Sequence, residues 1–445
     1  MNKKSVYIVT LGCSKNEVDS EIMLGILDKD KYCIADSLED ANIIIVNTCG
    51  FIESAKEESI DEIWEMTKYK RIGDCEYLLL SGCLAQRYSK ELLDEIEDVD
   101  AIIGTGNIKD LNNILDNLKS ENRLIKIDNI NSQYLEGVKR INHSSTAYVR
   151  ISEGCDNFCT YCIIPKLRGK HRSRRIEDII HEVEEISYNG VKEIVLIAQN
   201  TTDYGKDLYG QYSLALLLNK LNIIKDVKWI RILYLYPDNI NDELISAIKN
   251  NDKVVKYLDI PLQHINDNIL KLMNRKTNRN QIIQIINKLR REIPEIIIRT
   301  TFIVGFPGEI EDYFNDLYEF IEEMKFDKLG VFTYSKEEGT SAYGLANQLD
   351  DYIKEDRKNK IMKLQKEISK EKLMSKVNKT YETLVEEKID DRTYIGRTYM
   401  DNKEIDGLVY ISTNKKLSLD KFYHIRITDS LEYDLIGVIE DESSK

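Results

Sequence analysis

Three cysteines lie close together in the middle of the chain, at spacings of four and three residues. They are Cys155, Cys159 and Cys162, in the run Glu153-Gly154-Cys155-Asp156-Asn157-Phe158-Cys159-Thr160-Tyr161-Cys162. Three thiolates at these spacings can bind three irons of a 4Fe–4S cluster, and no fourth cysteine follows them as it does in ferredoxin runs. The spacing therefore predicts a cluster in which one iron has no protein ligand.

An iron without a protein ligand can chelate the amino and carboxylate groups of S-adenosylmethionine, a cofactor that then carries out the difficult chemistry. A zinc site is the alternative interpretation, because closely spaced cysteines also bind zinc. Structural zinc normally has four ligands, often from two Cys or His pairs, and no second pair lies near these cysteines in the sequence. The pattern therefore favours an iron–sulfur cluster.

The composition is that of an ordinary soluble protein, with 445 residues, a formal net charge of −14 and a pI near 5.1. A chain of this length can form two or three domains with full cores. The acidic balance argues against nucleic acid as a substrate, because phosphate binding needs a basic surface. A basic protein partner suits it better.

The sequence shows no membrane or secretion signal. No apolar run approaches the roughly 20 residues of a membrane span, and the first apolar segment is too short for a signal peptide. We therefore expect a cytoplasmic protein. Thiols stay reduced there, so clustered cysteines are more plausible as metal ligands or catalysts than as disulfides.

Residues 1–125 alternate strand-like and helix-like segments, which predicts a doubly wound parallel sheet covered on both faces. The expected strands are residues 6–11, 43–46, 77–80 and 101–103. Cys13, Cys49 and Cys83 each follow the end of one strand by two or three residues. Because sites form at the carboxyl ends of such strands, we expect the three cysteines to converge as a second metal-binding triad. The alternative is three buried free cysteines that act as small apolar residues.

A polar stretch at residues 128–146 reads as a linker, and a second β–α series follows it. Its expected strands are residues 147–151, 191–198, 229–235, 256–260, 296–304 and 329–333. Six strands with intervening helices predict a partial (β/α)6 barrel in a domain spanning 140–370, with its site at the carboxyl ends of the strands. Cys155 comes shortly after the first strand, at that end.

The last part of the chain is predicted to be a charged helix over 351–377, followed by a small β-barrel or sandwich over 378–445. Its expected strands include residues 380–385, 408–411, 422–428 and 433–439. Residues 378–445 contain 15 acidic and 10 basic side chains. The small domain is therefore expected to be acidic overall.

Longer motifs surround the cysteines. They include Leu11-Gly12-Cys13-Ser14-Lys15-Asn16, Asn47-Thr48-Cys49-Gly50-Phe51-Ile52, Gly82-Cys83-Leu84-Ala85-Gln86-Arg87, Ile197-Ala198-Gln199-Asn200-Thr201-Thr202, Asp259-Ile260-Pro261-Leu262-Gln263-His264 and Arg299-Thr300-Thr301-Phe302-Ile303-Val304-Gly305-Phe306-Pro307-Gly308-Glu309. In these motifs and the Cys155 run, the chain resembles the radical SAM methylthiotransferases over nearly its whole length. Two positions depart from the members that modify a ribosomal protein, which often have proline at Ser14 and aspartate at Asn200. Asparagine at Asn200 is what the members that modify transfer RNA show.

The resemblance implies an enzyme with two 4Fe–4S clusters and S-adenosylmethionine. The cluster at Cys155 would generate a radical that removes hydrogen from the β-carbon of an aspartate in ribosomal protein uS12. The auxiliary cluster at Cys13, Cys49 and Cys83, in an N-terminal methylthiotransferase domain, would carry the sulfur. A flavodoxin or ferredoxin is the implied electron donor. Methylthiolation of transfer-RNA adenosine and a non-catalytic iron–sulfur protein remain alternatives.

The resemblance also implies that the C-terminal domain is TRAM-like, and its acidic charge favours a basic protein substrate such as uS12. Six residues are candidate contacts of S-adenosylmethionine: Tyr161 beside the adenine, Glu193 at the methionine ammonium, Gln199, Gln263 and Arg299 near strand ends, and Gly305 in a tight turn. Each has an alternative role. Tyr161 could simply pack beside the cluster, Glu193 could be a solvated surface residue, and Gly305 could form a plain turn. Gln199, Gln263 and Arg299 could instead form hydrogen bonds to buried backbone groups. The sequence identifies no general base.

Overall fold

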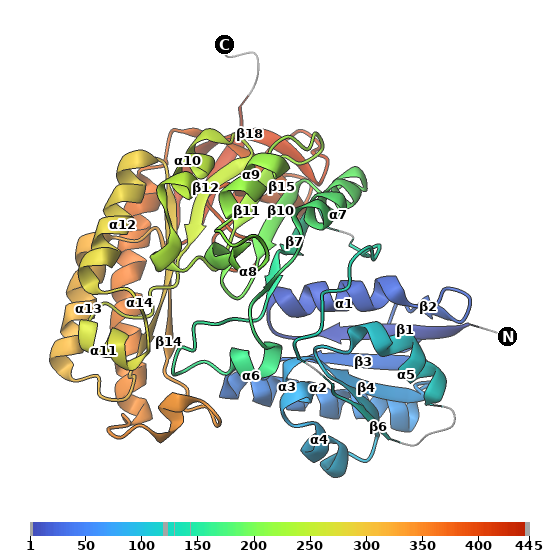
Figure 1. The fold of residues 1–445 in the computed structure, drawn as a ribbon. Helices are drawn as coiled ribbons and strands as arrows, with labels where there is room; N and C mark the ends of the chain where they lie inside the picture. The colour runs from blue at the N-terminus through green and yellow to red at the C-terminus, as the bar shows by residue number, and fades with distance from the viewer. Residues whose placement is uncertain (1–2, 119–122, 129, 143, 441–445) are drawn as a thin grey trace.

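The structure is a computed structural model that describes residues 3–118, 123–128, 130–142 and 144–440. Within these residues the strands form two six-stranded sheets, a closed five-stranded barrel and a two-stranded sheet (Figure 1). The predicted α/β fold class is confirmed. We refer to the N-terminal unit (β1–β6), the central barrel (β7 and β10–β14) and the C-terminal barrel (β15–β19).

The N-terminal unit is a parallel sheet of order β2-β1-β3-β4-β5-β6 with helices on both faces. Its strands are β1 (Lys4–Thr10), β2 (Tyr32–Ile34), β3 (Ile43–Thr48), β4 (Tyr77–Ser81), β5 (Val99–Ile103) and β6 (Leu124–Lys126). Its α-helices are α1 (Ser14–Ile26), α2 (Glu53–Ile72), α3 (Gly82–Arg87), α4 (Ser89–Glu95) and α5 (Leu111–Asn117). Every residue of β3 is buried, because a parallel strand covered on both faces has no solvent side.

The central barrel consists of six parallel strands in the order β14-β13-β12-β11-β10-β7, as predicted for a partial barrel. The strands are β7 (Thr146–Arg150), β10 (Glu193–Ile197), β11 (Trp229–Ile232), β12 (Val254–Asp259), β13 (Ile297–Val304) and β14 (Lys328–Thr333), and β8 (Ser152–Glu153) pairs with β9 (Arg172–Ser173). The helices are α6 (Ile164–Arg168), α7 (Ile176–Tyr188), α8 (Lys206–Tyr209), α9 (Leu214–Leu221), α10 (Asp242–Asn250), α11 (Asp267–Leu272), α12 (Arg279–Glu292) and α13 (Glu311–Met324).

Helix α14 (Asp351–Met374) connects the central barrel to the C-terminal barrel and buries Ile361, Ile368 and Leu373. The five strands that close the C-terminal barrel are β15 (Thr380–Lys388), β16 (Thr393–Thr398), β17 (Val409–Ser412), β18 (Lys421–Ser430) and β19 (Leu435–Ile439).

The inner face of the central barrel and the interior of the C-terminal barrel belong to one apolar core. Tyr148 and Val195 from the former share it with Leu384 and Val409 from the latter. The C-terminal barrel is therefore docked against the inner face of the central barrel. Among the described residues, no helix is long and apolar enough to cross a membrane.

Candidate functional site

Three cysteines from separate segments meet at the carboxyl edge of the N-terminal sheet. Cys13 caps α1 after β1, Cys49 follows β3, and Cys83 lies in the first turn of α3 after β4. Burial, with smaller contributions from the nearby Cys13 and Cys83, raises the pKa of the Cys49 thiol to about 11. The structure thus brings the three sulfur atoms close enough to interact, and we call them the Cys13 triad.

Glycine is required where these segments approach one another. Gly12 has a φ of +87°, and a Cβ atom there would lie 2.8 Å from the sulfur of Cys49. Gly82 has a φ of +90°, and a Cβ atom there would lie 2.3 Å from the carbonyl oxygen of Thr48. Both positions are conformations that residues with a Cβ rarely adopt. The glycines of the Leu11-Gly12-Cys13 and Gly82-Cys83 motifs therefore allow the triad to assemble.

The second set, which we call the Cys155 triad, lies in one loop between β8 and α6. The amide of Cys155 donates to the carbonyl of Gly169 at 3.1 Å, and the amide of Cys162 donates to the carbonyl of Cys159 at 3.0 Å. Burial, with a smaller contribution from Cys159, raises the pKa of the Cys155 thiol to about 11. The loop follows β7, at the carboxyl end of the barrel strands.

The donor set of each triad fits a 4Fe–4S cluster, since each offers three thiols and thiolates are the ligands of such clusters. A bound metal removes the protons that burial otherwise favours. Within the described part of the chain, no three His, Cys, Asp or Glu side chains converge closely enough to hold a single metal ion. A cluster does not need that convergence, because each thiolate binds its own iron.

Two predicted cofactor contacts lie beside the Cys155 triad. Tyr161 interacts electrostatically with Cys159 and Cys162, and burial raises its pKa well above the usual value. Gln199 follows β10, and its side-chain amide donates to Glu153 Oε1 at 3.5 Å. Both residues thus lie near the Cys155 triad, and their contact with a cofactor stays a prediction.

Gln263 follows β12 in a strained conformation with a φ of +72°. Its side-chain Oε1 is buried and has no hydrogen-bond partner among the described residues. A buried acceptor without a partner is unusual in a native protein and is consistent with a site for a ligand donor. The prediction for Gln263 thus gains an observation in its favour.

Gly305 follows β13 in a left-handed turn with a φ of +72°. Its amide donates to Glu309 Oε1 at 3.0 Å, and a Cβ atom would lie 2.3 Å from Lys354 Cγ. The imidazole of His264, which is fully buried, lies 3.2 Å from Glu309 Oε2. The turn therefore has a structural need for glycine, and a cofactor contact at Gly305 stays a prediction.

The structure contradicts the expected role of Glu193. This residue begins β10, so it lies at the opposite end of the strand from Gln199. Its carboxylate is fully buried and accepts from Arg231 and from Arg397 of the C-terminal barrel, both at 2.7 Å. These two guanidinium groups outweigh burial and lower the pKa of Glu193 to about 2. Glu193 joins the two barrels and is not placed to contact a cofactor at the carboxyl ends.

Arg299 also differs from its prediction. It is the third residue of β13, well before the strand ends at Val304. Its guanidinium donates to Asp259 Oδ1 at 3.0 Å and lies 3.5 Å from Asp406 of the C-terminal barrel. Arg299 therefore lies within the strand rather than at its end, and its charge is paired with two carboxylates.

Sequence reasoning missed a cavity of about 520 Å³ beside Cys13. All three units line it, with Cys13 and Glu17 from the N-terminal unit, Tyr148 and Tyr234 from the central barrel, and Glu404 from the C-terminal barrel. Burial, with smaller contributions from the nearby carboxylates of Glu21 and Glu404, raises the pKa of Glu17 to about 7. The sequence carried no signal for the cavity, because its walls come from three distant segments.

The chain is similar to known proteins over its full length. Residues 149–321 match the radical SAM superfamily, residues 377–439 match the TRAM domain, and residues 5–104 match a family described as uncharacterized protein family UPF0004. It is 50% identical to the ribosomal protein uS12 methylthiotransferase RimO of Clostridioides difficile, over 97% of this chain and 98% of that protein. The RimO of Acetivibrio thermocellus is 49% identical, with both chains covered completely. The chain belongs to the RimO family.

Solved structures share the fold at low sequence identity. The radical S-adenosylmethionine methyltransferase TsrM from Kitasatospora setae superposes with a TM-score of 0.55 at 11% identity, over 75% of each chain. The cobalamin-dependent radical enzyme OxsB gives a TM-score of 0.52 at 13% identity, over 81% of this chain and 56% of that one. The arrangement of an α/β unit beside a partial barrel is thus not confined to the RimO family.

Proposed function

We propose that this protein attaches a methylthio group to the β-carbon of an aspartate in ribosomal protein uS12. The observation that carries the proposal is Cys13 of the Cys13 triad, which lines a cavity whose walls come from all three units. Relatives named uS12 methylthiotransferase, about half identical over the full length, support the choice of substrate.

Each triad would hold one 4Fe–4S cluster, and Tyr161, Gln199, Gln263 and Gly305 would contact S-adenosylmethionine beside Cys155. When bound, these groups supply an electron, a carbon-centred radical, a methyl group and sulfur. The chain itself must hold the target carbon within a few ångström of the sulfur donor, because a radical reacts with whatever it meets first. The cavity beside Cys13 would serve that purpose.

The charge of the cavity supports a basic protein as substrate. Glu17 and Glu404 both line it, and the pKa of Glu17 is raised to about 7 because burial and nearby carboxylates oppose its ionisation. A lysine or arginine beside the target aspartate would relieve this repulsion, whereas an RNA phosphate would add to it. The cavity thus favours a substrate with basic side chains beside the target aspartate, in addition to any preference set by the acidic C-terminal barrel.

The transfer-RNA alternative derives from Asn200, and the local structure gives this residue another role. Asn200 is buried, and its side-chain oxygen accepts from the amide of Thr202 at 3.1 Å while its nitrogen donates to Asp203 at 2.8 Å. It caps the turn after β10. A residue held in this way reports on the turn rather than on the substrate.

The remaining assignments complete the proposal. We divide the chain into domains at residues 1–125, 140–370 and 378–445, and we place the protein in the cytoplasm with a flavodoxin or ferredoxin as electron donor. A reduced compartment is where exposed thiols such as Cys13 persist until a cluster binds.

Mass spectrometry of uS12 from a deletion strain tests the function. We expect the methylthio group on the target aspartate to be absent, to return with the wild-type gene, and to stay absent with Cys13→Ala. Transfer RNA from the same strains provides the control. An intact modification on uS12 together with a lost one on transfer RNA would move the function to the alternative substrate.

A further inference from the structure

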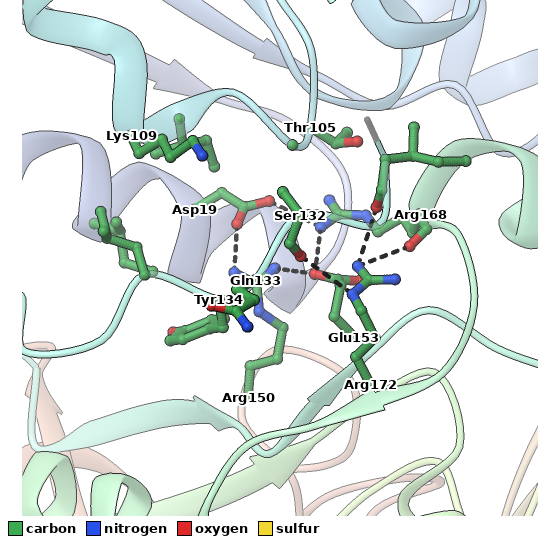
Figure 2. A pocket seen from close by; sticks show the side chains of 15 residues that line it. Asp19, Thr105, Lys109, Ser132, Gln133, Tyr134, Arg150, Glu153, Arg168 and Arg172 are labelled. Atoms are coloured by element: carbon green, nitrogen blue, oxygen red, sulfur yellow. Dashed lines mark hydrogen bonds and ion pairs between the residues drawn. The ribbon is translucent and has the colours of Figure 1, made fainter. Parts of the chain in front are cut away.

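A buried arginine lies between the two cysteine triads. Arg168 is the last residue of α6, six positions after Cys162, and its side chain is 2% exposed. Figure 2 shows it beside Asp19 of the N-terminal unit and Glu153 of the central barrel, at the wall of a small cavity of about 50 Å³. A charge buried this deeply must be paired to be tolerated.

Toward the N-terminal unit, Arg168 contacts the residues that hold the Cys13 triad. It donates to Asn16 Oδ1 at 2.8 Å and to Asp19 Oδ2 at 3.0 Å. Asn16 in turn donates to the carbonyls of Leu11 at 2.9 Å and Thr48 at 3.0 Å. These carbonyls lie just before Cys13 and Cys49, so Arg168 supports both loops through a single amide.

Toward the central barrel, the same guanidinium contacts Glu153 Oε2 at 3.2 Å. Glu153 Oε1 accepts from the amide of Gly154 at 3.1 Å, next to Cys155. Arg150 donates to Asp19 at 2.6 Å and to Glu153 at 2.7 Å, which closes a ring of two arginines and two carboxylates (Figure 2). The ring is neutral overall and ties the support of one triad to the support of the other.

Apolar packing reinforces this link. Cys83 forms a small buried cluster with Ile163 and Leu167, and the hydroxyl of Thr105 donates to the carbonyl of Leu167 at 2.9 Å. The segment that follows Cys162 is therefore docked directly onto a cysteine of the other triad. Arg168 ends this segment, beside the thiols of the Cys13 triad.

We propose that Arg168 is a positioning residue that fixes the separation of the two clusters and raises the reduction potential of the cluster on the Cys13 triad. A buried cation stabilises the more negative, reduced state of a nearby cluster, and charge and hydrogen bonds around the sulfurs set cluster potentials. Lysine cannot replace it fully, because a single ammonium does not reproduce the planar fork that meets Asn16, Asp19 and Glu153 together. The inference rests on the proposed function only in requiring that both clusters bind.

The potential is measured by a redox titration followed by electron paramagnetic resonance. The titration uses a parent protein in which Cys155, Cys159 and Cys162 are all replaced by alanine, so that only the cluster on the Cys13 triad contributes to the signal. We expect Arg168→Met to lower its potential and Arg168→Lys to restore most of it. Arg172→Met is the matched control, because Arg172 lies in the same cavity wall but donates to Asn131 and to backbone carbonyls, that of Arg168 included, and not to the Asp19 and Glu153 carboxylates.

Asp19→Asn gives a shift of the opposite sign. It removes a negative charge from the ring and leaves Arg168 in place, so the potential should rise. This variant also decides the matter if Arg168→Met fails to retain its cluster. Equal potentials in the parent protein, Arg168→Met and Arg172→Met, or a fall in Asp19→Asn, would overturn the electrostatic part of the proposal.

The separation is tested in the protein with both clusters, from the spin–spin coupling between them when both are reduced. Arg168→Lys should alter this coupling, and Arg172→Met should leave it unchanged. An unchanged coupling in Arg168→Lys would overturn the positioning part. If the shifts occur but wild-type protein does not modify uS12, the proposed function fails while this inference stands. If wild-type protein modifies uS12 but none of the variants shows a shift, the inference about Arg168 fails while the proposed function stands.

Discussion

The two cysteine triads offer the same three thiols but are built in different ways. The Cys155 triad spans eight positions, from 155 to 162, in one loop. The Cys13 triad spans 71 positions, from 13 to 83, and depends on β1, β3 and β4 being neighbours in one parallel sheet. The Cys155 triad is thus formed by one short segment, whereas the Cys13 triad exists only when the whole N-terminal unit is folded.

The difference extends to accessibility. Cys13 is exposed beside a cavity, whereas Cys49 and Cys83 are buried, and all three members of the Cys155 triad are partly exposed. A donor of sulfur must meet a large substrate, while a cluster that activates a small cofactor needs only a narrow opening. Exposed Cys13 therefore gives its triad one opening toward a large substrate, and variants at each triad probe the two roles separately.

The largest effects are expected from the cysteines themselves. Cys155→Ala should abolish cleavage of S-adenosylmethionine, because we propose that the iron without a protein ligand at this triad binds the cofactor. Cys13→Ala should leave cleavage measurable while methylthio transfer is lost. Each variant should fall from about eight to about four irons per chain, as measured by iron and acid-labile sulfide analysis after anaerobic reconstitution.

The two cysteine variants can contradict the division of roles. Methylthio transfer by Cys13→Ala would remove the sulfur-donor assignment from that triad. Zinc in place of iron, without acid-labile sulfide, would exclude the enzyme and favour a structural metal site. Cys33→Ala is a suitable control, since Cys33 is an exposed residue of the edge strand β2 and belongs to neither triad.

The next effects concern the glycines beside each triad. Gly12→Ala should reduce iron on the Cys13 triad alone, because the new Cβ would lie 2.6 Å from Cys49 Cβ. Gly154→Ala should impair the Cys155 triad alone, since its Cβ would lie 2.0 Å from the carbonyl oxygen of Lys170. Backbone strain adds about 1–3 kcal/mol in each case. Gly137→Ala has a similar φ and open space around it, so it separates backbone strain from the clash.

The sequence predicted both triads and the six strands of the central barrel, because cysteine spacing and buried strands leave strong local patterns. It failed where a role depends on which end of a strand a residue occupies. Glu193 follows Gly190 in a motif that suggested a cofactor contact, yet it begins β10 and pairs with Arg397, 204 residues away. The three-residue strands β2 and β6 were missed because so short a segment has no readable alternation.

Arg168 and the cavity at Cys13 could not be predicted for a related reason. Arg168 contacts Asn16 across 152 residues, and Glu404 reaches the cavity from the C-terminal barrel. Contacts of this kind leave no periodic pattern, since each depends on how separately folded units dock. Spacing therefore predicted the cysteines of both triads, whereas the residues that arrange them became visible only in three dimensions.

A variant in the buried ion pairs of Glu193 is expected to change the stability of the whole protein without changing cluster binding at either triad. Arg397→Met should destabilise the protein by about 3–5 kcal/mol, because it removes one of two cations from a buried carboxylate. The pKa of Glu193 is lowered to about 2 in the folded protein, so the stability it contributes is present above about pH 4.3 and is lost as the pH falls toward about 2. Urea unfolding of both proteins at pH 7 and pH 3 measures this, and the difference between them should shrink at pH 3.

Iron content shows whether Arg397→Met affects either triad. Arg397 lies at the start of the barrel strands, opposite the Cys155 triad, so both clusters should remain in the folded variant. Loss of one cluster at a pH where the variant is still folded would show that the C-terminal barrel supports that triad directly. An equal difference in stability at pH 3 and pH 7 would contradict the lowered pKa of Glu193.

The smallest effect is expected from Glu17, which lines the cavity beside Cys13. Its pKa is raised from 4.5 to about 7, chiefly by burial, so its ionisation destabilises the folded protein increasingly from about pH 4.5 to about pH 7. Glu17→Gln should therefore raise the melting temperature by about 1–2 °C at pH 8 and have no effect at pH 4. Glu58→Gln, on the exposed surface of α2, is the control.

The same variant separates the two triads in function. Removing the negative charge of Glu17 should raise the KM for uS12 by about 3–10-fold, since complementary charge guides a basic partner, and it should leave S-adenosylmethionine cleavage without substrate unchanged. A rise in KM without a change in uncoupled cleavage places Glu17 with substrate recognition at the Cys13 triad. An unchanged KM would mean that the basic side chains of uS12 are bound elsewhere, and the acidic C-terminal barrel would then be the surface to mutate.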